Sequence, residues 1–266
     1  MQIIGFDQGT GPHIAELAAD GRLRPLAERE AFWRNPAQAM SAPAAPWQSA
    51  TGAHLVPAIA NSARVICIGL NYRDHAAEMQ LAIPEKPVVF ARWAKSLAVE
   101  GTPCPAVEAR FDWEVELGAV LGAPLHHATA EQARAAIFGY FAFNDLSARS
   151  YQNESAQWTL GKNTPASGPM SPVRTADEVA DPQNLRLTTR VNDRLAQDGT
   201  TANMIFPLVD LLVYLSRFMP LEPGDAIVTG TPAGVGNATG TFLVPGDVVE
   251  VEVAGVGKVK TPIIAP

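Results

Sequence analysis

The stretch Phe111-Asp112-Trp113-Glu114-Val115-Glu116-Leu117 alternates strictly between apolar and acidic side chains. Successive side chains of a β-strand point to opposite faces, so the apolar residues share one face and the three acids share the other. The pattern continues and predicts one strand over residues 111–121. The simplest interpretation is an amphipathic strand whose acidic face lies in water.

A metal site is the second interpretation of this strand. Like charges two residues apart on one face repel each other, and a bound cation removes that cost. Glu114 and Glu116 offer only oxygen ligands, which favours Mg²⁺, Mn²⁺ or Ca²⁺ over Zn²⁺. A third acid, Asp145, stands at the end of an apolar stretch. It would complete such a site, or it would merely cap the next turn.

The surrounding sequence is rich in strand signals. Strands are expected at 65–68, 138–144, 185–191 and, after the Asn192-Asp193 turn, through Leu195. Helical spacing is expected at 74–80, 131–137 and 206–218. Pro-Gly-Asp turns at 223–225 and 245–247 suit type II geometry and precede strands at 226–229 and 248–253. With few βαβ alternations, the pattern predicts an α+β, β-rich fold.

The first part of the chain looks different from the rest. Prolines and alanines are dense between Asn35 and Trp47. Because proline resists both helix and sheet, we interpret this stretch as a connector. It divides the chain into a small N-terminal unit, residues 1–55, and a catalytic domain, residues 56–266.

Composition excludes several classes of protein. The 266 residues are 47% hydrophobic and 18% charged, which is typical of a globular protein with a real core. A net charge of −7 argues against a nucleic-acid partner but leaves a small anionic substrate open. Cys67 and Cys104 do not form a disulfide framework. No leader is visible, and the apolar stretch 204–219 is too short and too polar to span a bilayer, so we expect a cytoplasmic protein without a membrane partner.

A second polar constellation follows the strand at 65–68. His75 and Glu78 are three residues apart, so a helical turn places them on one face. A histidine whose ring is held by a carboxylate is a natural general base, and a surface ion pair is the alternative. The Gly-rich loop 229–236 lacks the P-loop and dinucleotide signatures. It is either a tight turn or a set of backbone N–H groups presented to a carboxylate.

Taken together and in this order, these segments resemble the fumarylacetoacetate hydrolase family. The motifs are Gly69-Leu70-Asn71-Tyr72-Arg73-Asp74-His75, Asp112 to Gly118, Asn144 to Arg149, Met204-Ile205-Phe206, Leu221 to Asp225 and Thr229 to Gly236. They cover roughly residues 64–262. The resemblance implies a compact mixed β-roll of the family's C-terminal type, assembled as a homodimer.

The resemblance also implies roles for single residues. Glu114, Glu116 and Asp145 would hold Mg²⁺, with Mn²⁺ or Ca²⁺ as alternatives. His75 and Glu78 would activate water, and Lys162 would steady the oxygen atoms of the substrate. The implied substrate contacts are Arg149, Gln152, Gln197, Gly230 and Thr231. From the sequence alone, each taken singly, solvent exposure is the simpler interpretation of Arg149, Gln152 and Lys162.

Two departures concern the substrate rather than the metal. Ser150 stands where many members of the family have Asp, and the run from Lys162 to Pro169 is shorter than usual. Because this loop would line the pocket, the resemblance does not determine the chemical identity of the substrate's tail.

We therefore expect a metal-dependent hydrolase that cleaves a C–C bond in a 2,4-diketo acid, an acylpyruvate or fumarylpyruvate-like compound, through a metal-bound enolate. The first alternative keeps the metal and changes the reaction to oxaloacetate-like decarboxylation, isomerisation or hydration of a 2-keto acid. The second alternative is a non-catalytic binding module in which the acids form a solvated face.

Overall fold

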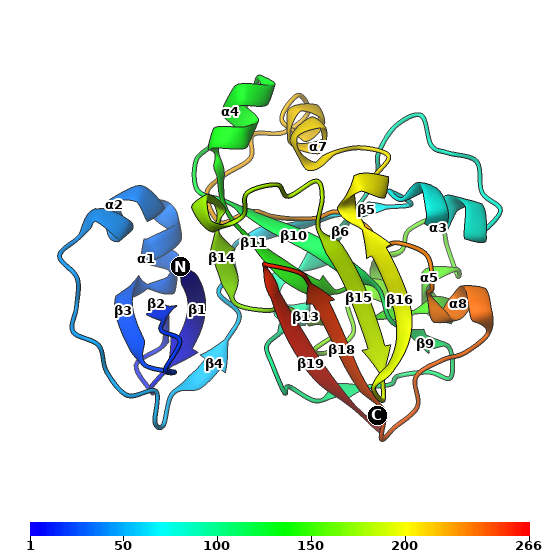
Figure 1. Ribbon diagram of the computed structural model, residues 1–266, viewed down its shortest axis with the longest axis horizontal. Helices are drawn as coiled ribbons and strands as arrows, with labels where there is room; N and C mark the ends of the chain where they lie inside the picture. The colour runs from blue at the N-terminus through cyan, green and yellow to red at the C-terminus, as the bar shows by residue number, and fades with distance from the viewer.

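The structure, a computed structural model, describes every residue from 1 to 266, and its larger sheet has ten strands (Figure 1). Their order is β3-β2-β1-β14-β11-β10-β17-β5-β6, with β4 paired to β1. The bounds are β1 (Gln2–Asp7), β2 (Pro12–Leu17), β3 (Leu23–Glu28), β4 (His54–Val56), β5 (Arg64–Gly69), β6 (Val88–Trp93), β10 (Val115–Leu121), β11 (Ile137–Asn144), β14 (Val173–Thr175) and β17 (Ala226–Val228).

A second sheet of five strands covers part of the first, in the order β16-β15-β18-β19-β8. Its strands are β8 (Cys104–Pro105), β15 (Arg186–Val191), β16 (Arg194–Thr200), β18 (Val248–Val253) and β19 (Gly257–Ile264). Two short pairs complete the strands: β9 (Phe111–Asp112) with β12 (Ser147–Ala148), and β7 (Leu97–Ala98) with β13 (Gly168–Pro169).

The helices are short and lie around the sheets. They are α1 (Arg29–Arg34), α2 (Pro36–Ser41), α3 (Arg73–Glu78), α4 (Ala130–Ala135), α5 (Arg149–Gln152), α6 (Thr159–Lys162), α7 (Leu208–Leu215) and α8 (Gly236–Thr239), with 3-10 turns η1 (Ala94–Ser96), η2 (Ala176–Glu178) and η3 (Thr201–Asn203). No helix has the length and apolar character needed to cross a membrane. The α+β, β-rich fold class is as expected.

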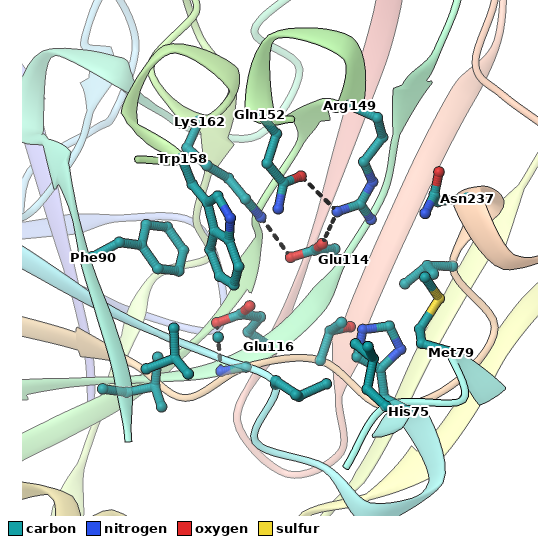
Figure 2. A pocket seen from close by; sticks show the side chains of 18 of the residues that line it. His75, Met79, Phe90, Glu114, Glu116, Arg149, Gln152, Trp158, Lys162 and Asn237 are labelled. Atoms are coloured by element: carbon teal, nitrogen blue, oxygen red, sulfur yellow. Dashed lines mark hydrogen bonds and ion pairs between the residues drawn. The ribbon is translucent and has the colours of Figure 1, made fainter. Parts of the chain in front are cut away.

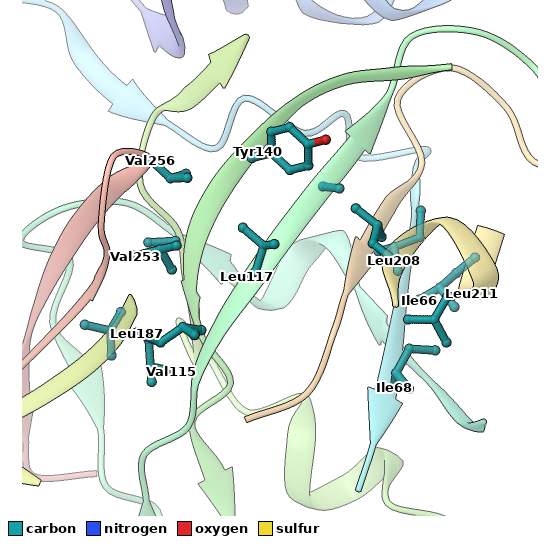
Figure 3. Close-up of a cluster of buried hydrophobic side chains, with 14 of the residues drawn as sticks. Ile66, Ile68, Val115, Leu117, Tyr140, Leu187, Leu208, Leu211, Val253 and Val256 are labelled. Atoms are coloured by element: carbon teal, nitrogen blue, oxygen red, sulfur yellow. The ribbon is translucent and has the colours of Figure 1, made fainter. Parts of the chain in front are cut away.

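The largest hydrophobic cluster of the core includes side chains that meet between the two sheets. Val115 and Leu117 of β10 point toward Leu187 of β15 and Val253 of β18, and all four are buried (Figure 3). These positions alternate along each strand, which is why the apolar face of residues 111–121 was readable from the sequence. The prediction for that face is confirmed.

The opposite face of the same segment differs from the simplest expectation. The predicted strand 111–121 is interrupted at Trp113 and Glu114, between β9 and β10. At this interruption the backbone N–H of Glu114 donates to the side-chain Oδ1 of Asn144 at 3.1 Å, in place of a backbone carbonyl of a neighbouring strand. Glu114 and Glu116 are only 6% and 2% exposed, so the interpretation as an acidic face in water is wrong.

The expected connector between Asn35 and Trp47 is also partly wrong, because helix α2 occupies its first half. Pro36 stands at the first helical position, where its missing N–H removes no helix hydrogen bond. Asn35 caps the helix by accepting a hydrogen bond from Gln38 N at 3.1 Å. The N-terminal strands extend the large sheet, because β1 pairs with β14. The division at residue 55 stays a prediction.

Both Pro-Gly-Asp turns take the expected geometry. Gly224 and Gly246 have φ of +90° and +101°, the left-handed region that glycine tolerates without strain. Both turns lead into strands, β17 and β18, that carry core residues.

Gly118 gives a test of packing beside the site. It lies opposite Phe141, and an added Cβ would stand 2.2 Å from the Phe141 ring. Gly118→Ala is therefore expected to lower the free energy of unfolding by about 1–3 kcal/mol, the usual cost of overpacking. Urea unfolding measures this, and the double variant Gly118→Ala/Phe141→Leu should recover part of the loss. An unchanged midpoint for the single variant would contradict the packing described.

Candidate active site

A cavity of about 240 Å³ opens beside the end of β10. Its polar lining includes His75, Glu114, Glu116, Arg149, Gln152 and Lys162. Backbone and side-chain atoms of Gly230 and Thr231, in the Gly-rich loop, form another part of the wall. The predicted site residues thus come from α3, β10, α5, α6 and the loop after β17, and most of them meet in one place (Figure 2).

Two carboxylates of the cavity lining, those of Glu114 and Glu116, converge with that of Asp145, which does not itself line the cavity. Ligand atoms of Glu114, Glu116 and Asp145 all lie within 4.8 Å of one another. The antiparallel register of β10 and β11 causes this, because Val115 lies opposite Asn144 and the acids lie beside that pair. Asp145 N also donates to Glu114 O at 2.9 Å.

Cationic side chains neutralise part of this charge, and two of them, Lys162 and Arg149, also line the cavity. Lys162 Nζ lies 2.7 Å from Glu114 Oε2 and 2.6 Å from Asp145 Oδ2. Arg149 Nη1 lies 2.6 Å from Glu114 Oε1. Burial opposes ionisation of Glu114, but the Lys162 ammonium and then the Arg149 guanidinium outweigh it and lower its pKa to about 2. The same carboxylates raise the pKa of Lys162, against the effect of its own burial.

Glu116 has no such partner. It accepts a hydrogen bond from Gly230 N at 2.8 Å, and none of the ion pairs within 4.0 Å at this site includes it. Burial, followed by the neighbouring Asp145 and Glu114, raises the pKa of Glu116 well above its usual range. Three carboxylate donors, one of them without a cationic partner, fit a hard divalent cation such as Mg²⁺ or Mn²⁺.

His75 and Glu78 lie on helix α3, as the spacing predicts. His75 Nδ1 and Glu78 Oε2 are 3.4 Å apart. Glu78 also accepts hydrogen bonds from Gly234 N, at 2.9 and 3.1 Å to its two oxygens. The Gly-rich loop therefore presents a backbone N–H to the carboxylate of Glu78. This contact holds Glu78 in position, and Glu78 in turn holds His75.

Arg149 and Gln152 are buried rather than solvent-exposed, and so is Lys162. Arg149 Nε donates to Asp112 Oδ2 at 2.8 Å, and its Nη1 donates to Gln152 Oε1 at 3.0 Å. Asp112 is thus no part of the carboxylate triad. It also accepts hydrogen bonds from Gly236 N at 2.7 Å and Asn237 N at 2.9 Å, so it fastens the end of the Gly-rich loop.

Gln197 does not line the cavity. Its Oε1 accepts hydrogen bonds from Val115 N at 3.0 Å and Thr189 Oγ1 at 2.7 Å. Its Nε2 donates to Thr231 Oγ1 and to Pro232 O, both at 2.9 Å. With its amide fully engaged by the protein, Gln197 positions Thr231 and has no group left for a substrate.

Arg92 was missed by the sequence reasoning. It is 2% exposed, pairs with Asp145 through Nε, and donates from Nη2 to Leu146 O at 2.7 Å and from Nη1 to Ser167 Oγ at 2.8 Å. The one available signal was its place two residues after Phe90, which puts both side chains on the inner face of β6.

Asn163, next to Lys162, was also missed. Its Oδ1 accepts a hydrogen bond from Trp93 N at 2.7 Å. Its Nδ2 donates to Thr159 O at 2.9 Å and to Ala91 O at 3.3 Å. These contacts fasten the end of α6, and with it Lys162, to the outer strand β6.

Known proteins are similar to this chain in sequence or in fold. A human mitochondrial oxaloacetate tautomerase is 33% identical over 276 aligned positions, covering 98% of this chain and 87% of that protein. A 5-carboxymethyl-2-hydroxymuconate delta-isomerase from Mycobacterium smegmatis has a TM-score of 0.83 at 28% identity, with 100% of both chains covered. Fumarylpyruvate hydrolase from Pseudomonas aeruginosa, in complex with Mn²⁺ and pyruvate, has a TM-score of 0.71 at 26% identity, covering 80% of this chain and 92% of that chain.

A family of proteins also matches most of the chain. Residues 64–264 match the C-terminal domain of fumarylacetoacetate (FAA) hydrolase, a range that contains the carboxylate triad, the His75–Glu78 pair and Lys162. The β-rich fold and the order of the motifs agree with that match. The chain therefore belongs to the fumarylacetoacetate hydrolase family.

Proposed function

We propose that this protein is a metal-dependent hydrolase that cleaves a C–C bond in a 2,4-diketo acid of the acylpyruvate type. The observation that carries the proposal is the convergence of three buried carboxylates beside a cavity that is also lined by His75, the partner of Glu78. A hydrolase of the family that holds Mn²⁺ and pyruvate has the same fold, which supports this choice of substrate.

The roles of the residues follow from their contacts. Glu78, held by Gly234, orients the His75 ring so that its free nitrogen takes a proton from water. The resulting hydroxide attacks the C4 carbonyl of the substrate and the C3–C4 bond breaks. The proton taken by His75 is returned to C3, so the products are a carboxylic acid and pyruvate. Lys162, kept charged by its acidic neighbours, faces the negative charge that develops on the pyruvate portion. A divalent cation held by Glu114, Glu116 and Asp145 would supply Lewis-acid stabilisation of that charge.

A direct test is a screen of acylpyruvates and oxaloacetate with Mg²⁺ or Mn²⁺ added. Loss of the enol absorbance together with stoichiometric release of pyruvate is expected for at least one acylpyruvate. Enol loss without any pyruvate would reject hydrolysis and favour keto–enol isomerisation.

A second candidate function is tautomerisation or decarboxylation of oxaloacetate at the same carboxylates. The similarity to the human oxaloacetate tautomerase over nearly the whole chain favours it. These reactions need no hydrolytic water, so His75→Ala separates the two proposals. Retained tautomerisation or decarboxylation with lost hydrolysis would show that one site supports both.

We further propose Mg²⁺ as the working cation and a homodimer as the assembly. The oxygen-only donor set accepts both Mg²⁺ and Mn²⁺, so titration with each ion decides between them. Light scattering of the purified protein, whose chain mass is 28.3 kDa, tests the dimer.

Arg92 gives a prediction for the environment of the proposed metal ligands. The three nitrogens of the Arg92 guanidinium contact Asp145, Leu146 and Ser167. Lysine keeps the positive charge but has a single nitrogen, so it cannot make all three contacts. Arg92→Lys is therefore expected to weaken Mn²⁺ binding about 10- to 100-fold, as loss of an outer-shell partner usually does. Calorimetry measures this, with Lys95→Ala, an exposed change nearby, as the control. Equal Mn²⁺ affinity in Arg92→Lys and wild type would exclude this role.

A further inference from the structure

Away from the carboxylates, the lining of the cavity is largely apolar. Eight of the lining residues are hydrophobic, and five of them are here called the apolar lining: Met79, Leu81, Val88, Phe90 and Trp158. It begins next to the charged end, because the Phe90 ring lies 5.4 Å from Lys162 Nζ. In Figure 2, Phe90 and Trp158 lie side by side on one flank of Glu116, and Met79 lies on the other.

The position of Trp158 is built into the sheet. Its ring meets Phe90 edge-on, with centroids 5.2 Å apart and planes at 67°. On its other side it rests on Gly69, where any Cβ would stand 2.2 Å from the indole. Gly69 pairs with Val88 across β5 and β6, so Val88, Phe90 and Trp158 form one continuous apolar surface. A ligand that extends from the carboxylates meets this surface.

Each cationic side chain of the lining already has a carboxylate partner, although Nη2 of Arg149 contacts Asp112 only as an ion pair and makes no hydrogen bond. Lys162 lies between Glu114 and Asp145, and Arg149 contacts Asp112, Glu114 and the amide of Gln152. His75 is paired with Glu78. The remaining polar lining residues, Gln152, Asn153, Thr231 and Asn237, carry no charge.

The consequence concerns a substrate with a carboxylate at each end. Its first carboxylate would lie at the cation-binding end, and its second would be desolvated against apolar side chains with no cation beside it. Burial of an unpaired charge is strongly unfavourable, whereas an alkyl or aryl tail gains from the same burial.

We propose that the tail of the substrate is an uncharged apolar group, so that this protein selects monocarboxylic over dicarboxylic 2-oxo acids. This inference rests on the proposed hydrolase function for the position of the carboxylate head, and it argues against oxaloacetate, a dicarboxylic 2-oxo acid, as the preferred substrate. It assigns Leu81 and Trp158, with their apolar neighbours, as the residues that decide specificity.

Binding of two unreactive acids tests the inference without turnover. The Mn²⁺-loaded protein is titrated with 2-oxohexanoate and with 2-oxoglutarate, which share the head and have tails of similar length. The uncharged acid is expected to bind at least about tenfold more tightly, equivalent to about 1.4 kcal/mol. Equal affinities, or tighter binding of 2-oxoglutarate, would overturn the proposal.

A matched pair of variants locates the effect. Leu81 and Ile83 are 52% and 51% exposed on the same loop, but only Leu81 lines the cavity. Leu81→Arg places a cation at the cavity and should reduce the preference for 2-oxohexanoate by about tenfold, as one new ion pair would. Ile83→Arg should leave the ratio unchanged. The same shift in both variants would mean that overall charge, not the lining, controls the ratio, and would reject the assignment.

The outcome also separates this inference from the proposed function. If the binding preference holds while no acylpyruvate is cleaved, the hydrolytic function fails and the specificity stands. If acylpyruvates are cleaved but fumarylpyruvate reacts as fast as an acylpyruvate with an uncharged tail, hydrolysis stands and the specificity fails.

Discussion

Replacement of His75 with alanine is expected to lower kcat for acylpyruvate cleavage by roughly 10²–10⁴-fold, the usual contribution of a general base. The imidazole is the group in the cavity that an adjacent carboxylate, Glu78, holds in place for proton transfer. KM and the affinity for Mn²⁺ should change little, because His75 is not one of the three converging carboxylates.

The control for this variant is His126→Ala, which removes an exposed imidazole far from the cavity lining. Its kcat should equal that of the wild type. Glu78→Gln should show a smaller loss than His75→Ala, because the ring remains and only its orientation is weakened. An unchanged kcat in His75→Ala would remove the histidine from the mechanism.

Glu116→Gln is expected to abolish measurable Mn²⁺ binding and with it the catalytic activity. Glutamine has nearly the same shape, keeps an oxygen for the Gly230 N–H, and removes the one carboxylate of the triad that lacks a cationic partner. Wild-type protein at about 100 times the Kd of the ion should gain about 2.7 kcal/mol of stability from binding. The variant should gain almost none.

Thermal unfolding with and without Mn²⁺ distinguishes a lost ligand from a damaged fold. In chelator, Glu116→Gln should unfold at the same temperature as the wild type or higher, because repulsion from Glu114 and Asp145 is relieved. Glu131→Ala, on the exposed surface of α4, is the control and should respond to the ion as the wild type does. A full Mn²⁺-dependent shift in Glu116→Gln would place the cation elsewhere.

The parts of the site that were predictable depend on local periodicity. The alternation around Glu114 and Glu116 defines the faces of one strand, and the three-residue spacing of His75 and Glu78 defines one face of a helical turn. The apolar faces were equally readable, since burial against the second sheet follows the same period of two. What periodicity did not decide was whether the acidic face was solvated or buried.

The parts that were not predictable depend on pairing between distant segments. The spacing of Arg92 from Phe90 indicates its face of the strand, but its pairing with Asp145 is recognisable only once β6 is known to lie beside the segment that follows Asp145. Gln197 had a suitable residue type for a substrate contact, but its amide is engaged by Val115, Thr189 and the Gly-rich loop. Nothing within either residue's own neighbourhood in the sequence encodes those partners.

The contacts of Asn163 with β6 also bear on whether two molecules can associate through their edge strands. Strand β6 is the last strand of the large sheet, and an uncovered outer strand is a template for addition of another chain and for aggregation. Asn163 occupies the amide of Trp93 and the carbonyl of Ala91, two groups that such an incoming strand would need. A side chain that anchors Lys162 therefore also protects this border against intermolecular strand addition.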